Sequence, residues 1–325
     1  MEQEEITSFA PKLPPEEKPT IWQKTWVQIA IFIAAMVLVA VLVTRSGPGL
    51  PATAGSDHIA VVRVTGVMLT GDGEGGLLGM SDAAYSGQIA SEIREAADDG
   101  SCKGIVLKIN SPGGTPVAAE EISEAIAVAQ KAGKPVFACM EDEAASAAYW
   151  ISARCDKIYA YRTTITGSIG VIMHGYNVSE LMKALGVTSQ TVKAGKYKDV
   201  GSMDRPMTAE EKQMLQAMIN TTYDTFIDEV ARGRKLTPDR VRQLAEGRVY
   251  SGVQAKKVKL VDEIGTCSDC LADIGRKTGL GSEPDTVVSE GKPNLYRTIF
   301  GSLRIDPETL ISRLAESMAK EMTLR

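Results

Sequence analysis

Short apolar runs alternate with longer amphipathic stretches through the middle of the chain. The apolar runs that predict strands are residues 59–64, 104–109, 135–140, 157–161 and 168–173. Between the first three of them, residues 81–99 and 116–132 carry apolar side chains at helical spacing. Residues 163–167 are expected to form a turn, after which Ser168 begins the last strand. This rhythm predicts an α/β core with short parallel strands and crossover helices.

The second half of the chain begins with a long amphipathic helix. Thr208 and Glu211 have the spacing of a capping box. The apolar stripe that follows is Leu215, Met218, Ile219, Thr222, Tyr223, Phe226, Ile227 and Val230. We expect this stripe, its methionine included, to be buried in the core. A second helix is predicted at 236–246, and residues 247–265 return to the domain.

The N-terminal pattern predicts a membrane anchor. Residues 1–25 are rich in charged residues and proline, and they predict a disordered cytoplasmic tail. Residues 26–44 predict a transmembrane helix, because the apolar run 27–43 would span about 26 Å of a hydrocarbon core of about 30 Å. Trp22 and Trp26 would lie at the interface with water.

Positive charge orients this anchor. Three lysines precede the apolar run: Lys12, Lys18 and Lys24. Only Arg45 closely follows it, so the N-terminus is expected in the cytoplasm and the large domain outside the cell membrane. The rival is a cleavable signal peptide, since residues 52–54 have an A-x-A form. The long acidic start and the length of the apolar run favour a single-pass anchor.

The remaining boundaries follow from composition. Residues 45–57 form a Gly/Pro linker, and residues 58–280 carry the α/β domain. The glycine-rich residues 70–79 lack the G-K-[ST] ending of a phosphate loop and are interpreted as a mobile loop. Residues 281–325 predict a loop and an amphipathic helix that begins at Asp306. The helix would pack on its own domain, a neighbouring subunit or the membrane.

Charge and cysteine content limit the possible partners. A net charge of −5 leaves no general basic face, so no nucleic-acid partner is expected. Cys267 and Cys270 form a CxxC pair that suits a disulfide, half of a metal site or neither. A metal site needs two further ligands, and the sequence has no second CxxC and no histidine pair. An isolated structural pair is therefore favoured, with no metal.

One stretch combines a serine with very small neighbours. Four of the six residues nearest Ser146 are alanines, and a predicted strand ends shortly before it. Ser146 would then lie on a turn at a helix N-terminus, where amides and the helix dipole favour a developing negative charge. Such a serine is a candidate nucleophile. Small residues with one serine are also common where two elements pack closely, so this stretch alone leaves both interpretations open.

Two other stretches supply the groups that a nucleophilic serine needs. The strand at 104–109 runs into Asn110-Ser111-Pro112-Gly113-Gly114, whose glycines let backbone amides point at an oxyanion. Residues 193–199 hold lysines that would otherwise be solvated surface. The two histidines, His58 and His174, are poorly placed for a Ser-His-Asp triad. A Ser-Lys dyad is the simpler hypothesis.

Five motifs in this order resemble the short form of signal peptide peptidase A. They are N-S-P-G-G (110–114), A-A-S-A-A-Y (144–149), T-G-S-I-G-V-I (166–172), A-G-K-Y-K-D (194–199) and G-R-V-Y-S-G-V-Q-A-K-K-V-K-L-V-D-E-I-G (247–265). The resemblance runs from about Ile59 to about Leu280. It implies a Ser-Lys peptidase with a ClpP/crotonase-like core of repeated β/α units, here preceded by one transmembrane helix.

The resemblance also assigns site residues by position. It places the nucleophile on Ser146, the general base on Lys198 and the serine that orients the lysine on Ser168. The oxyanion donors would come from Gly113, Gly114 and Ala147. It implies no cofactor. It implies peptide substrates such as residual signal peptides, a membrane location, and a ring-like homo-oligomer in which neighbouring subunits share each dyad.

Some alternatives stay open. Lys196 is the nearest rival for the base, and Asp199 either anchors the loop by a surface pair or is solvated. Many family members have two glycines after the nucleophile, where this chain has Ala147 and Ala148. The alanine version, A-A-Y-W, resembles related peptidases of phage capsid maturation. A membrane-anchored scaffold without catalysis is therefore the alternative function. A crotonase-like acyl-CoA enzyme is disfavoured by the extracytoplasmic location.

Overall fold

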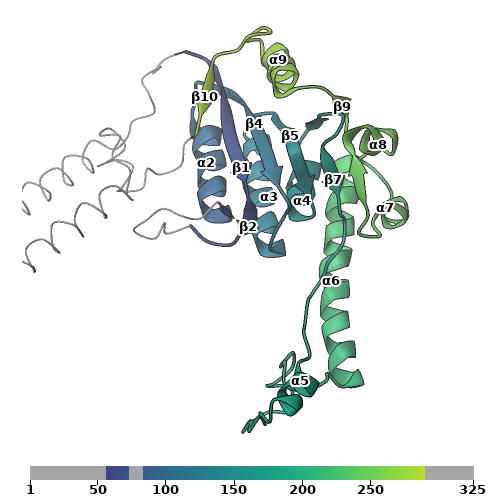
Figure 1. Ribbon diagram of the computed structural model, residues 1–325. Coiled ribbons are helices and arrows are strands. Elements are labelled where there is room, and N and C mark those ends of the chain that lie inside the picture. Colours follow the sequence, from purple (N-terminus) through teal and green to yellow (C-terminus); the bar gives the residue numbers. More distant parts are fainter. Residues whose placement is uncertain (1–55, 73–82, 290–325) are drawn as a thin grey trace, which may run out of the picture. The chain divides into compact units, whose positions relative to one another are not determined.

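The computed structural model describes residues 56–72 and 83–289, which belong to one compact unit of the chain (Figure 1). The strands of these residues are β1 (His58–Thr65), β2 (Val67–Leu69), β3 (Ala83–Tyr85), β4 (Cys102–Ser111), β5 (Val136–Ala145), β6 (Lys157–Ala160), β7 (Ile165–Gly167), β8 (Val249–Ser251), β9 (Glu263–Ile264) and β10 (Thr286–Val288). The helices are α2 (Ser86–Asp98), α3 (Pro116–Lys131), α4 (Ala147–Ala153), α5 (Ser179–Ala184), α6 (Ala209–Arg234), α7 (Pro238–Leu244), α8 (Gly252–Lys257) and α9 (Cys267–Thr278).

Several predicted segments lie outside the described residues. They are the tail (1–25), the transmembrane helix (26–44), nearly all of the linker (45–57), most of the glycine-rich loop and the C-terminal helix. Within the part of the chain that the structure describes, no helix combines the length and the apolar character needed to cross a membrane.

A mostly parallel sheet organises the described residues and confirms the α/β prediction. Its strands lie in the order β10-β1-β4-β5-β6-β9, and β7 pairs with both β5 and β8. All of these pairs are parallel except β7 with β8. Strand β5 pairs with β6 up to Met140 and with β7 from Glu143 onward, so it changes partner halfway along. The C-terminal end of β5, directly before Ser146, therefore lies beside β7.

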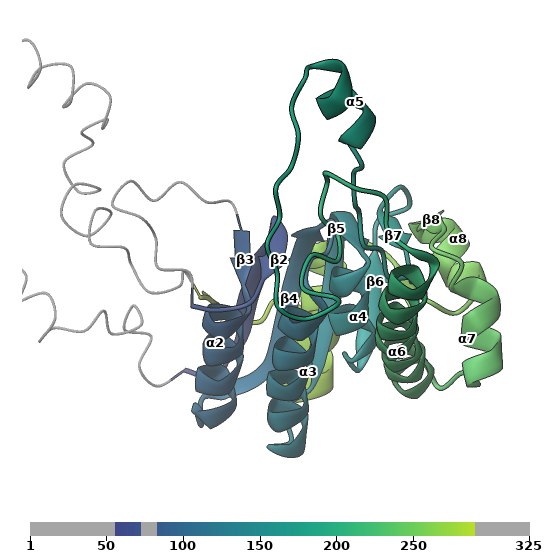
Figure 2. The same ribbon diagram turned by 90° about the horizontal axis from the view of Figure 1, so that it is seen from below.

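Helices cover both faces of this sheet. Alternate residues of β1, β4 and β5 form one large cluster with α2, α3, α4 and the C-terminal part of α6 (Figure 2). The intervening residues Ile59, Val106 and Phe137 form a smaller cluster with Cys270 and Ile274 of α9. Both sheet faces are therefore dry, which is the usual state of a parallel sheet.

The strand predicted at 168–173 is wrong. The structure has β7 at Ile165–Gly167, inside the predicted turn, and Ser168 follows it without starting a strand. The Thr166 hydroxyl donates to the Ala144 carbonyl at 2.7 Å and fixes β7 against β5. Gly167 and Ser168 then take φ angles of 84° and 50°, and two left-handed residues in a row end the extended conformation.

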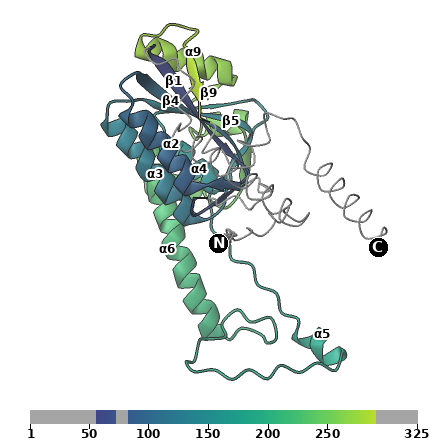
Figure 3. The ribbon, with the colours of Figure 1, turned by 90° about the vertical axis from the view of Figure 1, so that its left-hand side faces the viewer.

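Helix α6 begins with the predicted capping box, and both of its hydrogen bonds are present. Its burial contradicts the prediction of a continuous core face. Phe226, Ile227 and Val230 are buried, whereas Met218 is 51% exposed. The reason is that the N-terminal half of α6 extends beyond the sheet, together with the segment that contains α5 (Figures 1 and 3). The apolar pattern predicted burial correctly only where another element lies beneath it.

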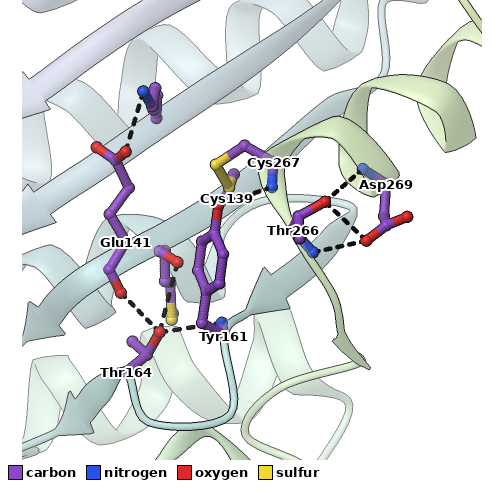
Figure 4. Close-up of a disulfide and its surroundings, with 9 residues drawn as sticks. Cys139, Glu141, Tyr161, Thr164, Thr266, Cys267 and Asp269 are labelled. Atoms are coloured by element: carbon purple, nitrogen blue, oxygen red, sulfur yellow. Dashed lines mark hydrogen bonds and ion pairs between the residues drawn. A yellow bond between two sulfur atoms is a disulfide. The ribbon is translucent and has the colours of Figure 1, made fainter.

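The CxxC cysteines do not pair with each other, which corrects the favoured interpretation. Cys139 on β5 is bonded to Cys267 at the start of α9, with a Cα–Cα distance of 5.5 Å (Figure 4). The backbone N–H of Cys267 donates to the Tyr161 hydroxyl at 3.3 Å. Cys270 is a free thiol, and burial raises its pKa to about 12. It is therefore protonated and unreactive near neutral pH.

The disulfide should contribute strongly to stability. It closes a loop of 128 residues, so its loss should lower the free energy of unfolding by about 2–5 kcal/mol. We expect this loss in the double variant Cys139→Ala/Cys267→Ala, measured by urea denaturation. A reductant should lower the stability of the parent protein and leave that of the variant unchanged. Equal stability of parent and variant without reductant would contradict the prediction.

Candidate active site

Ser146 occupies a sharp turn between a strand and a helix. Strand β5 ends at Ala145 and α4 begins at Ala147, as the sequence predicted. The backbone angles of Ser146 are φ 53° and ψ −122°, a conformation that costs a residue with a side chain about 1–3 kcal/mol. The alanines on both sides are 0–6% exposed, so larger residues would not fit. This turn projects a half-buried Ser146 from the edge of the sheet.

Two elements hold the turn in its strained form. The Ser146 N–H donates to the Gly167 carbonyl at the end of β7, at 2.9 Å. Four residues further, Trp150 stacks on Phe226 of α6 with ring centroids 4.9 Å apart. All seven residues of α4 are buried. The strain is therefore offset by hydrogen bonding on one side and by packing on the other.

Gly113 brings a second piece of backbone against Ser146. A Cβ atom at Gly113 would lie 2.8 Å from the Ser146 Cβ and 2.9 Å from the Ala147 nitrogen. Its φ of 101° is also unfavourable for any residue with a side chain. Only glycine therefore allows the loop after β4 to contact the turn after β5. The sequence predicted that the paired glycines leave their amides free to point at an oxyanion, and the contact with the Ser146 turn is an addition from the structure.

Two amides near Ser146 have no hydrogen-bond partner among residues 56–72 and 83–289. Gly114 forms a parallel β-bridge with Met68. In this bridge the Met68 N–H donates to the Gly113 carbonyl, and the Met68 carbonyl accepts from the Thr115 N–H. The N–H and carbonyl of Gly114 itself therefore face away from Met68. Among the described residues, neither the Gly114 N–H nor the Ala147 N–H donates a hydrogen bond. The Gly113 N–H, in contrast, donates to the buried Ser111 hydroxyl at 3.1 Å. Unpartnered amides of this kind can bind an oxyanion.

Ser168 lies beside Ser146 because of the strand register. Ala145 of β5 pairs with Gly167 of β7, and each of the two serines is the next residue of its strand. Ser168 shares the positive φ of Ser146, and its N–H donates to the Arg248 carbonyl at 2.9 Å. The structure thus brings together Ser146, Ser168, Gly113, Gly114 and Ala147.

Lys198 does not join this group within one chain. It lies between α5 and α6 in a stretch, residues 183–198, whose members are all exposed. The preceding Lys196 and Tyr197 both bond to Glu210 in the first turn of α6. Glu210 precedes Phe226 by sixteen residues, which is about 24 Å of helix from the contact between α6 and α4. No hydrogen bond links Lys198 to Ser146 in the described residues.

The three lysines of this segment differ in their ion pairs. Lys193 pairs with Asp199 at 2.5 Å, and Lys196 pairs with Glu210. The hydrogen bond to Glu210 raises the pKa of Lys196, which disfavours the neutral form that a general base needs. The Lys198 amine has no hydrogen bond and no ion pair within the described part of the chain. Of these three lysines, Lys198 is the one whose amine forms no ion pair with a carboxylate of the described residues.

The sequence did not reveal how this segment is held. Asp199 forms a surface ion pair, one of the two roles that the sequence left open, and its partners are Lys193 and Arg205. Arg205 also binds Glu211. The capping box pointed to Glu211, but no periodic pattern connects Asp199 with Arg205. Ser111 was likewise missed, although it lies inside the N-S-P-G-G motif.

The fold and these contacts define a class of protein. A half-buried serine in a strained strand-to-helix turn, at the end of a sheet strand and beside amides without partners among the described residues, is the arrangement of a nucleophile elbow. The chain is thus an α/β protein with an elbow serine at the carboxyl end of a parallel strand.

Comparison with known proteins gives the family. The model of peptidase family S49 matches residues 128–280. The "Putative protease slr0021" of Synechocystis is 34% identical over 72% of this chain and 87% of its own length. The "Putative signal peptide peptidase SppA" of Enterococcus faecium is 37% identical over 70% of this chain. The "Serine protease SPPA, chloroplastic" of Arabidopsis thaliana is 30% identical over 74% of this chain. The chain belongs to peptidase family S49, the signal peptide peptidase A family.

The relatives differ in length from the matched region. This region spans 65% of the Enterococcus protein and 36% of the Arabidopsis protein. The family model itself covers the elbow serine and the elements from the end of α3 to α9.

The strained conformation of Ser146 makes a stability prediction. We compare Ser146→Gly with Ser146→Ala, since both lack the hydroxyl and differ in the strained Cβ. Relief of strain should exceed the entropic cost of glycine, so the glycine variant should be about 1 kcal/mol more stable in chemical denaturation. The control is Ala217→Gly in the exposed middle of α6, which should lose about 1 kcal/mol. If Ser146→Gly is less stable than Ser146→Ala, as Ala217→Gly is less stable than the parent, Ser146 is not strained.

Proposed function

We propose that this protein is a membrane-anchored serine peptidase that hydrolyses peptide bonds with a Ser-Lys dyad. The single observation that carries the proposal is the strained Ser146 beside the unpartnered amides of Gly114 and Ala147. The strained conformation is costly to maintain, and it is the conformation that a nucleophile with neighbouring oxyanion donors requires.

The chemistry follows from this geometry. The Ser146 oxygen attacks the scissile carbonyl while a neutral Lys198 amine takes the hydroxyl proton. The Gly114 and Ala147 amides bind the negative oxygen of the tetrahedral intermediate. The Gly113 amide would have to leave Ser111 to take part. The carbon–nitrogen bond then breaks, Lys198 returns the proton to the leaving amine, and water hydrolyses the acyl-enzyme by the same proton transfers.

Lys198 can act as a base only after it is buried. A free lysine has a pKa of about 10.4, and a lysine base needs about 7 or 8. This change requires the charged form to be destabilised by about 3–5 kcal/mol. Lys198 is exposed in a single chain, so we propose that a second copy covers it. Ser168, beside Ser146, would accept a hydrogen bond from the incoming amine and orient it.

The segment that carries Lys198 has the surface of a subunit interface. Its apolar side chains are largely exposed in the described part of the chain: Ile172 and Tyr176 are each 73% exposed, Leu185 is 70% exposed and Val192 is 100% exposed. Large apolar side chains that are this exposed along one segment favour burial against a partner. These side chains support a homo-oligomer in which the segment of one copy reaches the Ser146 site of the next.

Location and fold are proposed on separate grounds. The Cys139–Cys267 disulfide supports a domain in an oxidising compartment, because such bonds are rare in the reducing cytosol. This agrees with an anchor at 26–44 that leaves the N-terminus in the cytoplasm.

The parallel sheet, whose strand β5 pairs first with β6 and then with β7, supports a ClpP/crotonase-like core.

The proposed substrates are extended apolar peptides such as residual signal peptides. The name of the Enterococcus relative suggests this class. A feature of this chain agrees with it: Gly114 is exposed, and its carbonyl, which the oxyanion does not use, faces away from Met68. An extended peptide can pair with a free backbone edge of this kind.

Replacement of the dyad residues tests the proposal. Ser146→Ala and Lys198→Met should each lower kcat with a fluorogenic peptide by at least about 10³-fold. Lys196→Met is the matched control, because its ion pair with Glu210 makes it unsuited to be the base. It should keep most of the activity. Labelling by a fluorophosphonate should be lost in Ser146→Ala, and an unlabelled parent protein would favour the non-catalytic scaffold.

Mixing the two inactive variants tests whether neighbouring copies share the dyad. Ser146→Ala and Lys198→Met subunits, assembled together, should regain roughly a quarter of parental activity, because that share of interfaces joins an intact serine to an intact lysine. Each variant assembled alone is the control. If the mixture stays inactive although native mass spectrometry shows mixed oligomers, the dyad lies within one chain.

A further inference from the structure

Arg205 joins two carboxylates that belong to different parts of the chain. Its Nε and Nη2 donate to Asp199 at 2.9 and 2.8 Å. Its Nη1 and Nη2 donate to Glu211 at 2.9 and 2.5 Å. One guanidinium therefore forms two bidentate pairs at once, the strongest geometry for such contacts. We call these three residues the Arg205 clamp.

The clamp links residues 193–199, which we call the lysine segment, to the N-terminal end of α6. Asp199 directly follows Lys198, and Glu211 lies in the first turn of α6. Glu211 is itself fixed, since it accepts from the Thr208 N–H at 2.8 Å and is only 3% exposed. The backbone beside Lys198 is thereby linked to the rigid start of α6 in an otherwise exposed segment.

The clamp keeps its charges across the pH range of any peptidase assay. Hydrogen bonds from Arg205 lower the pKa of Glu211 to about 2, and they hold the pKa of Asp199 below its usual range. Lys193 also faces Asp199, at 2.5 Å. A change of activity between pH 6 and pH 9 would therefore not come from titration of the clamp.

The clamp lies away from the packing around Ser146. Glu211 precedes Phe226 by fifteen residues, which is about 22 Å of helix from the contact between α6 and α4. Loss of the clamp would therefore leave the packing around Ser146 intact. Reactions that depend on alignment lose about 10²-fold when a group shifts by about 1 Å.

We propose that Arg205 is a positioning residue for the general base: the Arg205 clamp fixes the backbone of residues 195–199 so that Lys198 enters the neighbouring Ser146 site in a reactive direction. The inference rests on the proposed function and adds to it a residue that contacts neither substrate nor Ser146. Lysine cannot replace arginine here, because an ammonium cannot form two bidentate pairs.

Arg205→Gln tests the proposal through kcat, KM and the pH profile. We expect kcat to fall about 10²-fold while KM changes less than about threefold. Activity of the parent should rise with pH as Lys198 loses its proton. In the variant this rise should move to higher pH, because a misplaced amine is more solvated and its pKa is higher. A simple loss of folded enzyme would lower the rate without moving the rise.

Controls separate the clamp from other effects. Arg242→Gln removes a comparable pair with Asp224 at 2.8 Å, away from the lysine segment, and should leave kcat unchanged. Guanidinium ion at millimolar concentration should partly restore Arg205→Ala, and Arg205→Lys should stay impaired. Fluorophosphonate labelling of Ser146 should slow together with kcat in Arg205→Gln and not in Arg242→Gln, and the oligomer size of both variants should match that of the parent.

The outcomes decide between the two proposals. If the parent has peptidase activity and Arg205→Gln matches its kcat and pH profile, the positioning role is wrong and the proposed function stands. If the parent has no activity that depends on Ser146, the proposed function itself fails. Should Arg205→Gln not assemble, Asp199→Asn replaces it, since this variant frees the lysine segment and keeps the Arg205–Glu211 pair. An assembled Asp199→Asn oligomer with parental kcat and pH profile would overturn the positioning role.

Discussion

The contact between the Gly113 backbone and the Ser146 turn is the constraint on which the site depends. Parallel strands β4 and β5 end at the same edge of the sheet, and the absence of a side chain at Gly113 lets their two loops touch. The turn then has to adopt a strained φ, and the buried helix α4 holds it there. Strain of about 1–3 kcal/mol is small against the burial of Trp150 and its neighbours, so the fold can sustain it.

The same sheet leaves the other half of the site unfinished. Its helices bury both faces, yet residues 183–198 extend from it without covering any of it. The fold of one copy is therefore complete, whereas the proposed dyad is not. Under the proposed function, the exposed apolar side chains of this segment provide the association energy, and association provides the dry surroundings that a lysine base requires.

The sequence predicted those features that depend on neighbours in the chain. The turn around Ser146, the glycines at 113 and 114 and the Thr208–Glu211 box all follow from local chemistry. Features that depend on distant partners escaped it. The strand predicted from Ser168 was displaced to 165–167 by a hydrogen bond to Ala144, and Cys267 bonds to a residue 128 positions away. Met218 was predicted to be buried because an apolar stripe does not reveal whether anything lies beneath it.

The ion pairs of the lysine segment explain how one amine among several can serve as a base. Lys193, Lys196 and Arg205 are each bound to carboxylates. Hydrogen bonds to Glu210 and to Glu211 raise the pKa of Lys196 and of Arg205, respectively. When the segment enters a dry interface, such pairs can be buried as pairs, but an unpaired ammonium can avoid the cost of desolvation only by losing its proton. Lys198 is the amine without such a pair in this part of the described chain. The proposed assembly would therefore lower the pKa of Lys198 selectively, and the separation of Ser146 from Lys198 in one chain would keep the unassembled subunit inactive.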